Sequence, residues 1–214
     1  MKITKLGHCC MLIEEGDVRL LTDPGSFTAD RHKKIKDLDA ILFTHEHADH
    51  FHMDSLKQLL ESNPDVRVIC NSSVGELLMH ETIKHEVVAD KASIDVGGVS
   101  IEGCGTDHAV IHSSVPVASN TGFFIGGRLW YPGDAFPEFK KYAEVIALPT
   151  AGPWMKASDA IDYALARKPK KVFPVHDFIL SDIGQHVNTL IIGGILTQNN
   201  IEYMSVELGK EFEI

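Results

Sequence analysis

The segment "THEHADH", residues 44–50, constrains the fold of this chain more than any other stretch. It follows the short apolar run "DAILF", which is typical of a buried strand. After it, methionine and leucine recur at helical spacing from Met53 until Pro64 ends the pattern. The cluster therefore lies in a turn between a strand and a helix. Its carboxylates would repel one another there, as would its imidazoles once charged, unless they share a cation.

Four side chains of this turn are suited to hold a metal. His45 and His47 are two positions apart at a strand end and point the same way, while Asp49 and His50 return toward that space at the start of the helix. Deprotonated imidazoles that converge with a carboxylate are typical metal ligands, although a solvated polar turn is the alternative interpretation. Four ligands from one turn cannot all serve one tetrahedral ion with an open position, so two neighbouring ions are more natural.

Further candidate ligands follow other predicted strands. "CGTDHAVIH" offers His108 and His112, "WYPGDAF" places Asp134 after a Pro-Gly turn, and "VFPVHDF" places His176 at the end of an apolar strand. Each residue alone would be an ordinary capping or hydrogen-bonding side chain. Such strand ends can converge on one edge of a sandwich, and together with the first cluster they predict the rest of a ligand set.

The gross properties exclude several classes of protein. The length suits one substantial domain over residues 1–214. A net charge of −10 disfavours nucleic acid or an anionic membrane as the main partner, because both need a basic face. No apolar run resembles a signal peptide or a membrane span, so we expect a cytoplasmic protein. The chain has four cysteines, with no C-x-x-C pair among them: Cys9, Cys10, Cys70 and Cys104. We therefore expect small buried thiols in a reducing compartment.

Strand-like and helix-like segments alternate along the chain. Residues 2–25 predict two strands that turn at Glu15-Gly16-Asp17 and stop at Pro24-Gly25. Residues 85–130 predict an antiparallel meander of short strands. Apolar strands before and after "ASDAIDYALARK" predict a β-α-β unit. Hairpins combined with β-α-β units favour a mixed α/β sandwich over a doubly wound parallel sheet.

Some boundaries of helices and strands are also predicted. Ser73 with Glu76 three residues later predicts a capping box at the start of a helix. A last helix is expected near residues 186–198, although Gly193 and Gly194 each weaken it by about 1 kcal/mol. A final strand is expected over "IEYMSVEL".

The order of these motifs resembles the metallo-β-lactamase superfamily. The resemblance is carried by "THEHADH", His108, "GDAF" with Asp134 and "PVHD" with His176, and it covers nearly the whole chain. The opening, "LGHCCMLIE" followed by "LLTDPG", resembles the small metal-dependent hydrolase branch related to ascorbate-6-phosphate lactonases. The resemblance implies an α/β (α+β) fold, a four-layer αβ/βα sandwich with metals at the sheet edge.

The resemblance also implies how the ligands divide. One ion takes His45, His47 and His108, the other takes Asp49, His50 and His176, and Asp134 bridges them. His112 competes with His108, which is preferred because it comes sooner after the strand "VSIEGCG".

The early acid of the family matches Asp23, which would hold a ligand histidine by its free N–H. A turn-forming aspartate before Pro-Gly is the alternative for this residue.

The implied chemistry is hydrolysis. Two divalent ions would lower the pKa of a bridging water and hold it as hydroxide for attack on a small-molecule ester, lactone or phosphate-bearing substrate. Asp49 is the carboxylate best placed to orient the hydroxide and pass a proton to the leaving group. Zinc suits the nitrogen-rich ligand set, and the carboxylates also admit manganese or iron.

Substrate contacts and other functions are less constrained. His8, His52, His112, Asn120 and Trp154 are candidates for lining the pocket, and each also suits a structural role. A tRNA-processing nuclease of this family would carry a long basic insertion, which this acidic chain lacks. A redox centre usually replaces the second histidine of the motif by an acid, whereas His47 is intact. A homo-oligomer is compatible with the sequence.

Overall fold

The computed structural model describes all 214 residues, and its strands form two seven-stranded mixed sheets. The first sheet has the order β14-β1-β2-β3-β4-β5-β6, and the second has the order β13-β12-β11-β10-β9-β8-β7. The strands of the first sheet are β1 (Lys2–Gly7), β2 (Cys10–Glu15), β3 (Val18–Thr22), β4 (Ala40–Phe43), β5 (Arg67–Cys70), β6 (Glu86–Val87) and β14 (Glu211–Glu213). Those of the second are β7 (Ser93–Val96), β8 (Val99–Cys104), β9 (Gly122–Ile125), β10 (Leu129–Tyr131), β11 (Val145–Pro149), β12 (Lys171–Val175) and β13 (Glu202–Tyr203).

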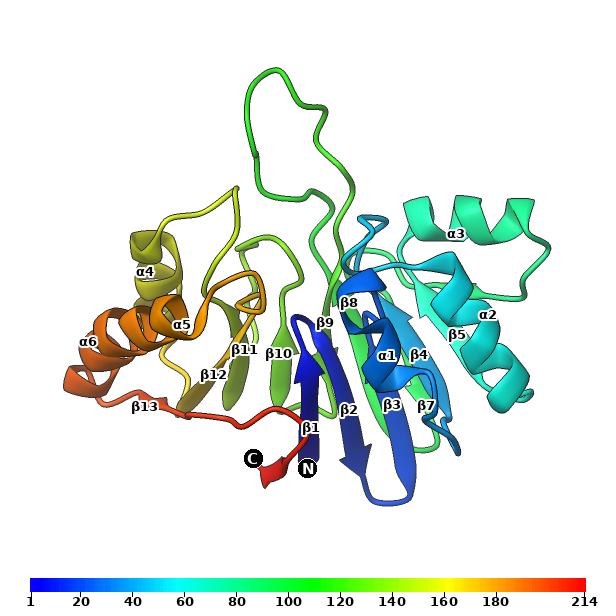
Figure 1. Cartoon of the computed structure of the whole chain (residues 1–214), viewed down its shortest axis with the longest axis horizontal. Coiled ribbons are helices and arrows are strands. Elements are labelled where there is room, and N and C mark those ends of the chain that lie inside the picture. The colour runs from blue at the N-terminus through cyan, green and yellow to red at the C-terminus, as the bar shows by residue number, and fades with distance from the viewer.

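Helices cover the outer faces of both sheets (Figure 1). The helices beside the first sheet are α1 (Ala29–His32), α2 (Met53–Ser62) and α3 (Ser72–His80). Those beside the second are α4 (Ala157–Arg167), α5 (Asp182–Asn188) and α6 (Gly194–Gln198), with a π-helical turn (Thr189–Gly193) between the last two. The expected four-layer αβ/βα sandwich is therefore confirmed.

Alternation along the central strands divides the core into three layers. In β4, Ala40 and Leu42 face the space between the sheets, whereas Ile41 and Phe43 pack under α2 and α3. The strand β11 does the same in the second sheet, so both central strands are buried on both faces. All four cysteines are free, and three of them are buried. None of the helices is both long enough and apolar enough to cross a membrane.

The amino-terminal segment departs from the predicted pair of strands. The first predicted strand is broken into β1 and β2, which pair with each other antiparallel. Gly7 has a φ of +136° and His8 a φ of +44°, and these values reverse the chain between the two strands. The prediction of one continuous strand was wrong because apolar residues continue through the reversal.

Three other predictions need correction. The capping residue of α3 is Asn71, whose side chain accepts from the Val74 N–H, while the Ser73 hydroxyl donates to Glu46. The predicted meander over residues 85–130 included Glu86–Val87, but this segment forms β6, which pairs parallel with β5 in the first sheet. The last helical segment begins earlier than expected, at Asp182, and the strand expected over residues 201–208 is only the two-residue β13, with β14 following it. The Ser73 contact with Glu46 and the pairing of β6 with β5 involve residues that are distant in sequence.

Candidate metal centre

The turn after β4 packs backbone to backbone against the loop after β3. The Ser26 N–H donates to the Ala48 carbonyl at 2.8 Å, and His50 and Phe51 both donate to the His47 carbonyl. Gly25 makes this contact feasible, because a Cβ atom there would lie 1.9 Å from the Asp49 carbonyl oxygen. The close contact fixes the turn that carries the histidine cluster.

A first group of ligand atoms comes from His45, His47 and His108. Their ligand atoms all lie within 4.8 Å of one another, and the ring centroids are 4.7 to 5.1 Å apart. His108 Nδ1 donates to the Ala109 carbonyl at 2.6 Å, which leaves Nε2 free to face the group. Residues from both sheets therefore meet in this group.

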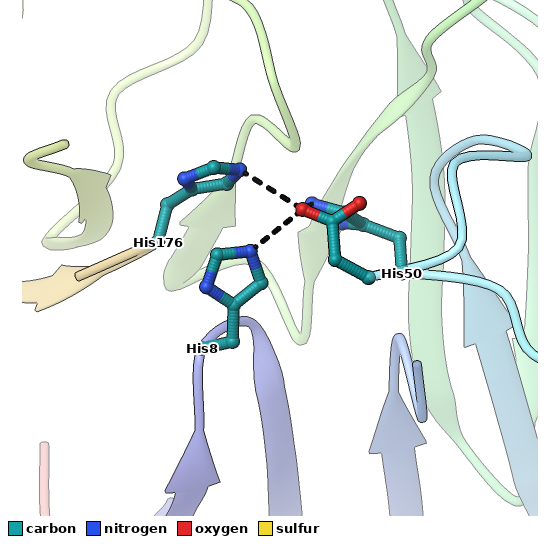
Figure 2. Close-up of side chains that lie close together, drawn as sticks. His8, His50 and His176 are labelled. Carbon is teal, nitrogen blue, oxygen red and sulfur yellow. Dashed lines mark hydrogen bonds and ion pairs between the residues drawn. The ribbon is translucent and has the colours of Figure 1, made fainter. Parts of the chain in front are cut away.

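A second group comprises Asp49, His50 and His176, and the structure adds His8 to it. Asp49 Oδ2 lies 3.0 Å from His8 Nε2, 3.6 Å from His176 Nε2 and 3.8 Å from His50 Nε2. Figure 2 shows the rings of His8 and His176 directed toward one carboxylate oxygen beside the His50 ring. The four side chains surround one small volume at the edge of the sandwich.

Asp134 lies between the two groups. Its Oδ2 atom is 3.4 Å from His108 Nε2 and 2.8 Å from His176 Nε2, and its Oδ1 atom is 3.2 Å from His50 Nε2. His45 Nε2 is 3.9 Å away. One buried carboxylate thus contacts nitrogens of both groups, which is the geometry that a bridging ligand requires.

The loop that carries Asp134 is held by two predicted pocket residues. Asn120 Oδ1 accepts from the Asp134 N–H at 3.0 Å, and Trp154 Nε1 donates to Asp134 Oδ2 at 3.0 Å. Gly133 precedes Asp134 with a φ of +66°, and a Cβ atom there would lie 2.3 Å from Asn120 Oδ1. Both Asn120 and Trp154 are buried, so they support the site from behind rather than line an open pocket.

Asp23 is fully buried and accepts several hydrogen bonds. Its carboxylate accepts from the Thr44 N–H at 2.8 Å, from the Thr44 hydroxyl at 2.7 Å and from the Tyr131 hydroxyl. It also lies 2.8 Å from His50 Nδ1, which turns His50 Nε2 toward Asp49 and Asp134. The sequence gives no sign of Tyr131 as a partner, because that residue lies inside a strand far along the chain.

Burial and charge set the protonation of the cluster. Burial lowers the pKa of His45 well below its usual value and also lowers that of His47, so both rings are neutral and can act as ligands. Burial opposes the charge on His50, but Asp134 and Asp23 outweigh it and raise the His50 pKa. For Asp134, His50 and His176 likewise outweigh burial and hold the pKa well below its usual range. The carboxylates keep their charge and favour a cation beside them.

The donor set fits divalent ions. Several buried atoms have no hydrogen-bond partner, namely Nε2 of His45, His50, His108 and His176 and Oδ1 of Asp134. Unpaired buried polar atoms are costly, and these atoms all converge on one place. Cys9 lies near His50 and Asp134, but burial raises the pKa of its thiol well above the usual value. Nitrogen-rich ligands with carboxylates between them are suited to two adjacent metal ions.

His112 lies apart from this centre. Its side chain is exposed, and its Nδ1 atom accepts from the Ser114 N–H at 3.1 Å within the loop that follows β8. The structure therefore brings His108, and not His112, into the first group. This loop extends away from the sheets at the top of Figure 1.

Comparisons with known proteins agree with this fold. Residues 2–176 match the family model described as Beta-lactamase superfamily domain. Protein Rv0786c of Mycobacterium tuberculosis is 37% identical over 85% of this chain and 86% of its own length. A UPF0173 protein of Pyrococcus abyssi is 30% identical over 82% of the chain and 83% of its own length. The metallo hydrolase Igni18 of Ignicoccus hospitalis superposes with a TM-score of 0.76 at 17% identity, covering 100% of this chain and 98% of its own.

The fold and the two facing ligand groups define a protein class in which metals are held at the edge of a β-sandwich. The chain belongs to the metallo-β-lactamase superfamily. The narrower resemblance to ascorbate-6-phosphate lactonases stays a prediction.

Proposed function

We propose that the chain is a hydrolase with two divalent metal ions that acts on a small-molecule ester, lactone or phosphate-bearing substrate. The observation that carries the proposal is the position of Asp134 between two groups of nitrogen donors. UPF0173 relatives from Aeropyrum pernix and Carboxydothermus hydrogenoformans are named metal-dependent hydrolases, which supports the class of reaction. The nitrogen-rich set favours zinc, and the carboxylates also admit manganese or iron.

Two bound ions would supply Lewis acidity, which lowers the pKa of water and polarises a carbonyl or phosphoryl oxygen. His45, His47 and His108 would hold one ion, and Asp49, His50 and His176 the other, with Asp134 shared.

Asp49 is the carboxylate that we assign to the proton transfers. Its side chain keeps 22% of its surface exposed, whereas that of Asp134 keeps 3%. Burial opposes its charge, but the hydrogen bond with His8 and the nearby His50 outweigh burial and lower the Asp49 pKa. An ionised carboxylate at the mouth of the site can orient water and carry a proton to the leaving group.

The surface beside the centre suits a small molecule. A groove of about 450 Å³ includes Asp107 and Ala109, which flank His108, and Ala135 and Phe136, which follow Asp134. This volume is within the range of small-ligand sites. A larger hollow of about 710 Å³ lies between α2 and β5, away from the metal ligands. The acidic charge of the chain favours a small substrate over RNA.

Metal analysis followed by a substrate screen tests the proposal. Protein purified without chelator is expected to carry about two ions per chain and to hydrolyse at least one lactone, thioester or phosphodiester. His108→Ala is expected to lose metal and activity, whereas the exposed His112→Ala serves as the matched control and keeps its metal. Fewer than two ions per chain after reconstitution would refute the binuclear centre, and loaded protein with redox activity but no hydrolysis would favour a redox metalloprotein.

A further inference from the structure

His8, a candidate for lining the pocket, lies against the second group of candidate metal ligands. It follows β1, and its side chain is fully buried in the reversal between β1 and β2. Its carbonyl oxygen accepts from the His176 N–H at 3.2 Å, and the two ring centroids are 4.0 Å apart. Because His176 follows β12 of the other sheet, His8 is tied to both sides of the sandwich.

The spacing of donor atoms around Asp49 matches a coordination shell. Donor atoms of a tetrahedral site with bonds of about 2.1 Å lie about 3.4 Å apart. The Nε2 atoms of His8, His176 and His50 lie 3.0, 3.6 and 3.8 Å from Asp49 Oδ2. His8 is therefore as close to the carboxylate as the two histidines already assigned to the second ion.

The His8 ring is held in this orientation by its backbone and by packing. Its φ of +44° is unusual for a residue other than glycine and turns the side chain into the centre. The Phe27 ring packs at its edge, with centroids 5.2 Å apart, and the His176 ring lies on another side. Nδ1 makes no hydrogen bond, so Nε2 is the only ring nitrogen with a polar neighbour. An uncommon backbone conformation thus directs a single donor atom at the ligand carboxylate.

We propose that His8 is a further protein ligand of the ion held by Asp49, His50 and His176, an inference that rests on the proposed binuclear centre. The two subsites are then unequal. The second is enclosed by four side chains of its own in addition to Asp134, whereas the first has three histidines and Asp134. Closed coordination is typical of tightly held ions and an open position is typical of catalytic ions. The first subsite has one protein ligand fewer, so it is the one with more room for substrate.

Stepwise loading of the apoprotein with cobalt(II) tests this role, because the visible spectrum reports the coordination of each ion independently of hydrolysis. His8→Gln keeps an amide that can donate to Asp49 but removes the imidazole ligand, and His8→Ala removes both. We expect wild-type protein to bind about two ions. Both variants should bind one ion normally and the other at least about 100-fold more weakly, with a changed spectrum for that ion. His112→Ala is the matched control for loss of a histidine and should load as wild type.

Each other outcome has a defined meaning. If His8→Gln loads as wild type and His8→Ala does not, His8 acts only as a hydrogen-bond donor to Asp49 and the proposal is wrong. If both variants load as wild type, His8 does not affect metal binding and the proposal is also wrong. Wild-type protein that binds fewer than two ions would instead overturn the binuclear centre itself. Wild-type protein loaded with cadmium-113 gives a test that needs no variant. The His8 ring protons should correlate with the same cadmium resonance as the ring protons of His50 and His176. If the His8 protons show no correlation with that resonance, His8 is not a ligand.

Discussion

Asp134 shows how much of the site depends on a single residue. Its carboxylate is nearly buried, lies near nitrogens of both ligand groups and also accepts the indole N–H of Trp154. Two neighbouring cations repel each other, and a shared carboxylate reduces that repulsion while setting their separation. Its charge should therefore matter more than its shape.

Asp134→Asn tests the charge because the substitution nearly preserves the side-chain shape. We expect one ion to bind at least about 100-fold more weakly and turnover to fall by a similar factor or more, while the fold survives. Metal content, hydrolysis rate and a thermal melt measured on the same sample would check this. Asp162→Asn, an exposed aspartate on α4 that lies in no part of the site, is the matched control. Normal metal content and rate in Asp134→Asn would show that Asp134 does not bridge the ions.

At the scale of elements, the loops that end the strands determine the geometry of the site. The loop after β3 and the turn after β4 contact each other through their backbones, with Gly25 against the Asp49 carbonyl. Neighbouring parallel strands bring these two loops to the same edge of the first sheet. A side chain between them would separate Asp23 from the turn that it supports.

Gly25→Ala is expected to disturb this contact. The added methyl group would lie 1.9 Å from the Asp49 carbonyl oxygen, so the loops must move apart. We expect a loss of about 1–3 kcal/mol in the free energy of unfolding, together with weaker binding of the ion held by Asp49 and His50. Denaturant unfolding and metal titration measure the two effects. Gly194→Ala in α6 is the control, since its Cβ atom would meet nothing within 4 Å. Equal stability of the two variants would contradict the packing argument.

The parts of the fold that depend on neighbouring residues could be predicted from the sequence. The apolar run of β4, the helical period of α2 and Pro64 beyond it are local signals, and the structure confirms this strand and helix. The contacts of Tyr131 with Asp23 and of His8 with Asp49 join residues from distant segments. No periodicity or spacing encodes such contacts, because they exist only once the two sheets have packed together.

The site itself shows the same division. A cluster of histidines after a strand indicates metal ligands whatever fold the rest of the chain adopts, because few other structures place several histidines so close together. Asn120 and Trp154 were expected at the pocket, but the structure places them behind Asp134 as hydrogen-bond partners. His8 was expected among the substrate contacts, and the structure places its ring beside Asp49, His50 and His176. Residue type shows that a side chain can bind, whereas only packing decides what it contacts.

Across the whole molecule, the centre joins the two halves of the sandwich. The cluster of residues 44–50 and His8 follow strands of the first sheet, whereas His108, Asp134 and His176 follow strands of the second. Each ion would therefore have ligands from both sheets. Bound metal should stabilise the packing of one sheet on the other as well as support the reaction.

Removal of metal is therefore expected to lower the melting temperature. A ligand present at 100 times its Kd adds about 2.7 kcal/mol to the free energy of unfolding if it binds only the folded state. Melts of chelated, reloaded and untreated protein should rank accordingly, and the melting temperature should rise with added zinc. A melting temperature that does not change on chelation and reloading would contradict this coupling.

The wide separation of the ligands along the chain also has a consequence for folding kinetics. His8 follows the first strand, whereas His176 follows β12, and their backbones are hydrogen-bonded to each other. Contacts between distant residues form slowly, because a long loop must close before they give any stabilisation. A nascent chain therefore displays its histidine-rich turn well before His176 has been synthesised, and the full affinity for metal arises only when the second sheet docks. Metal uptake would then mark the end of folding, and an ion captured earlier by the turn alone would dissociate easily.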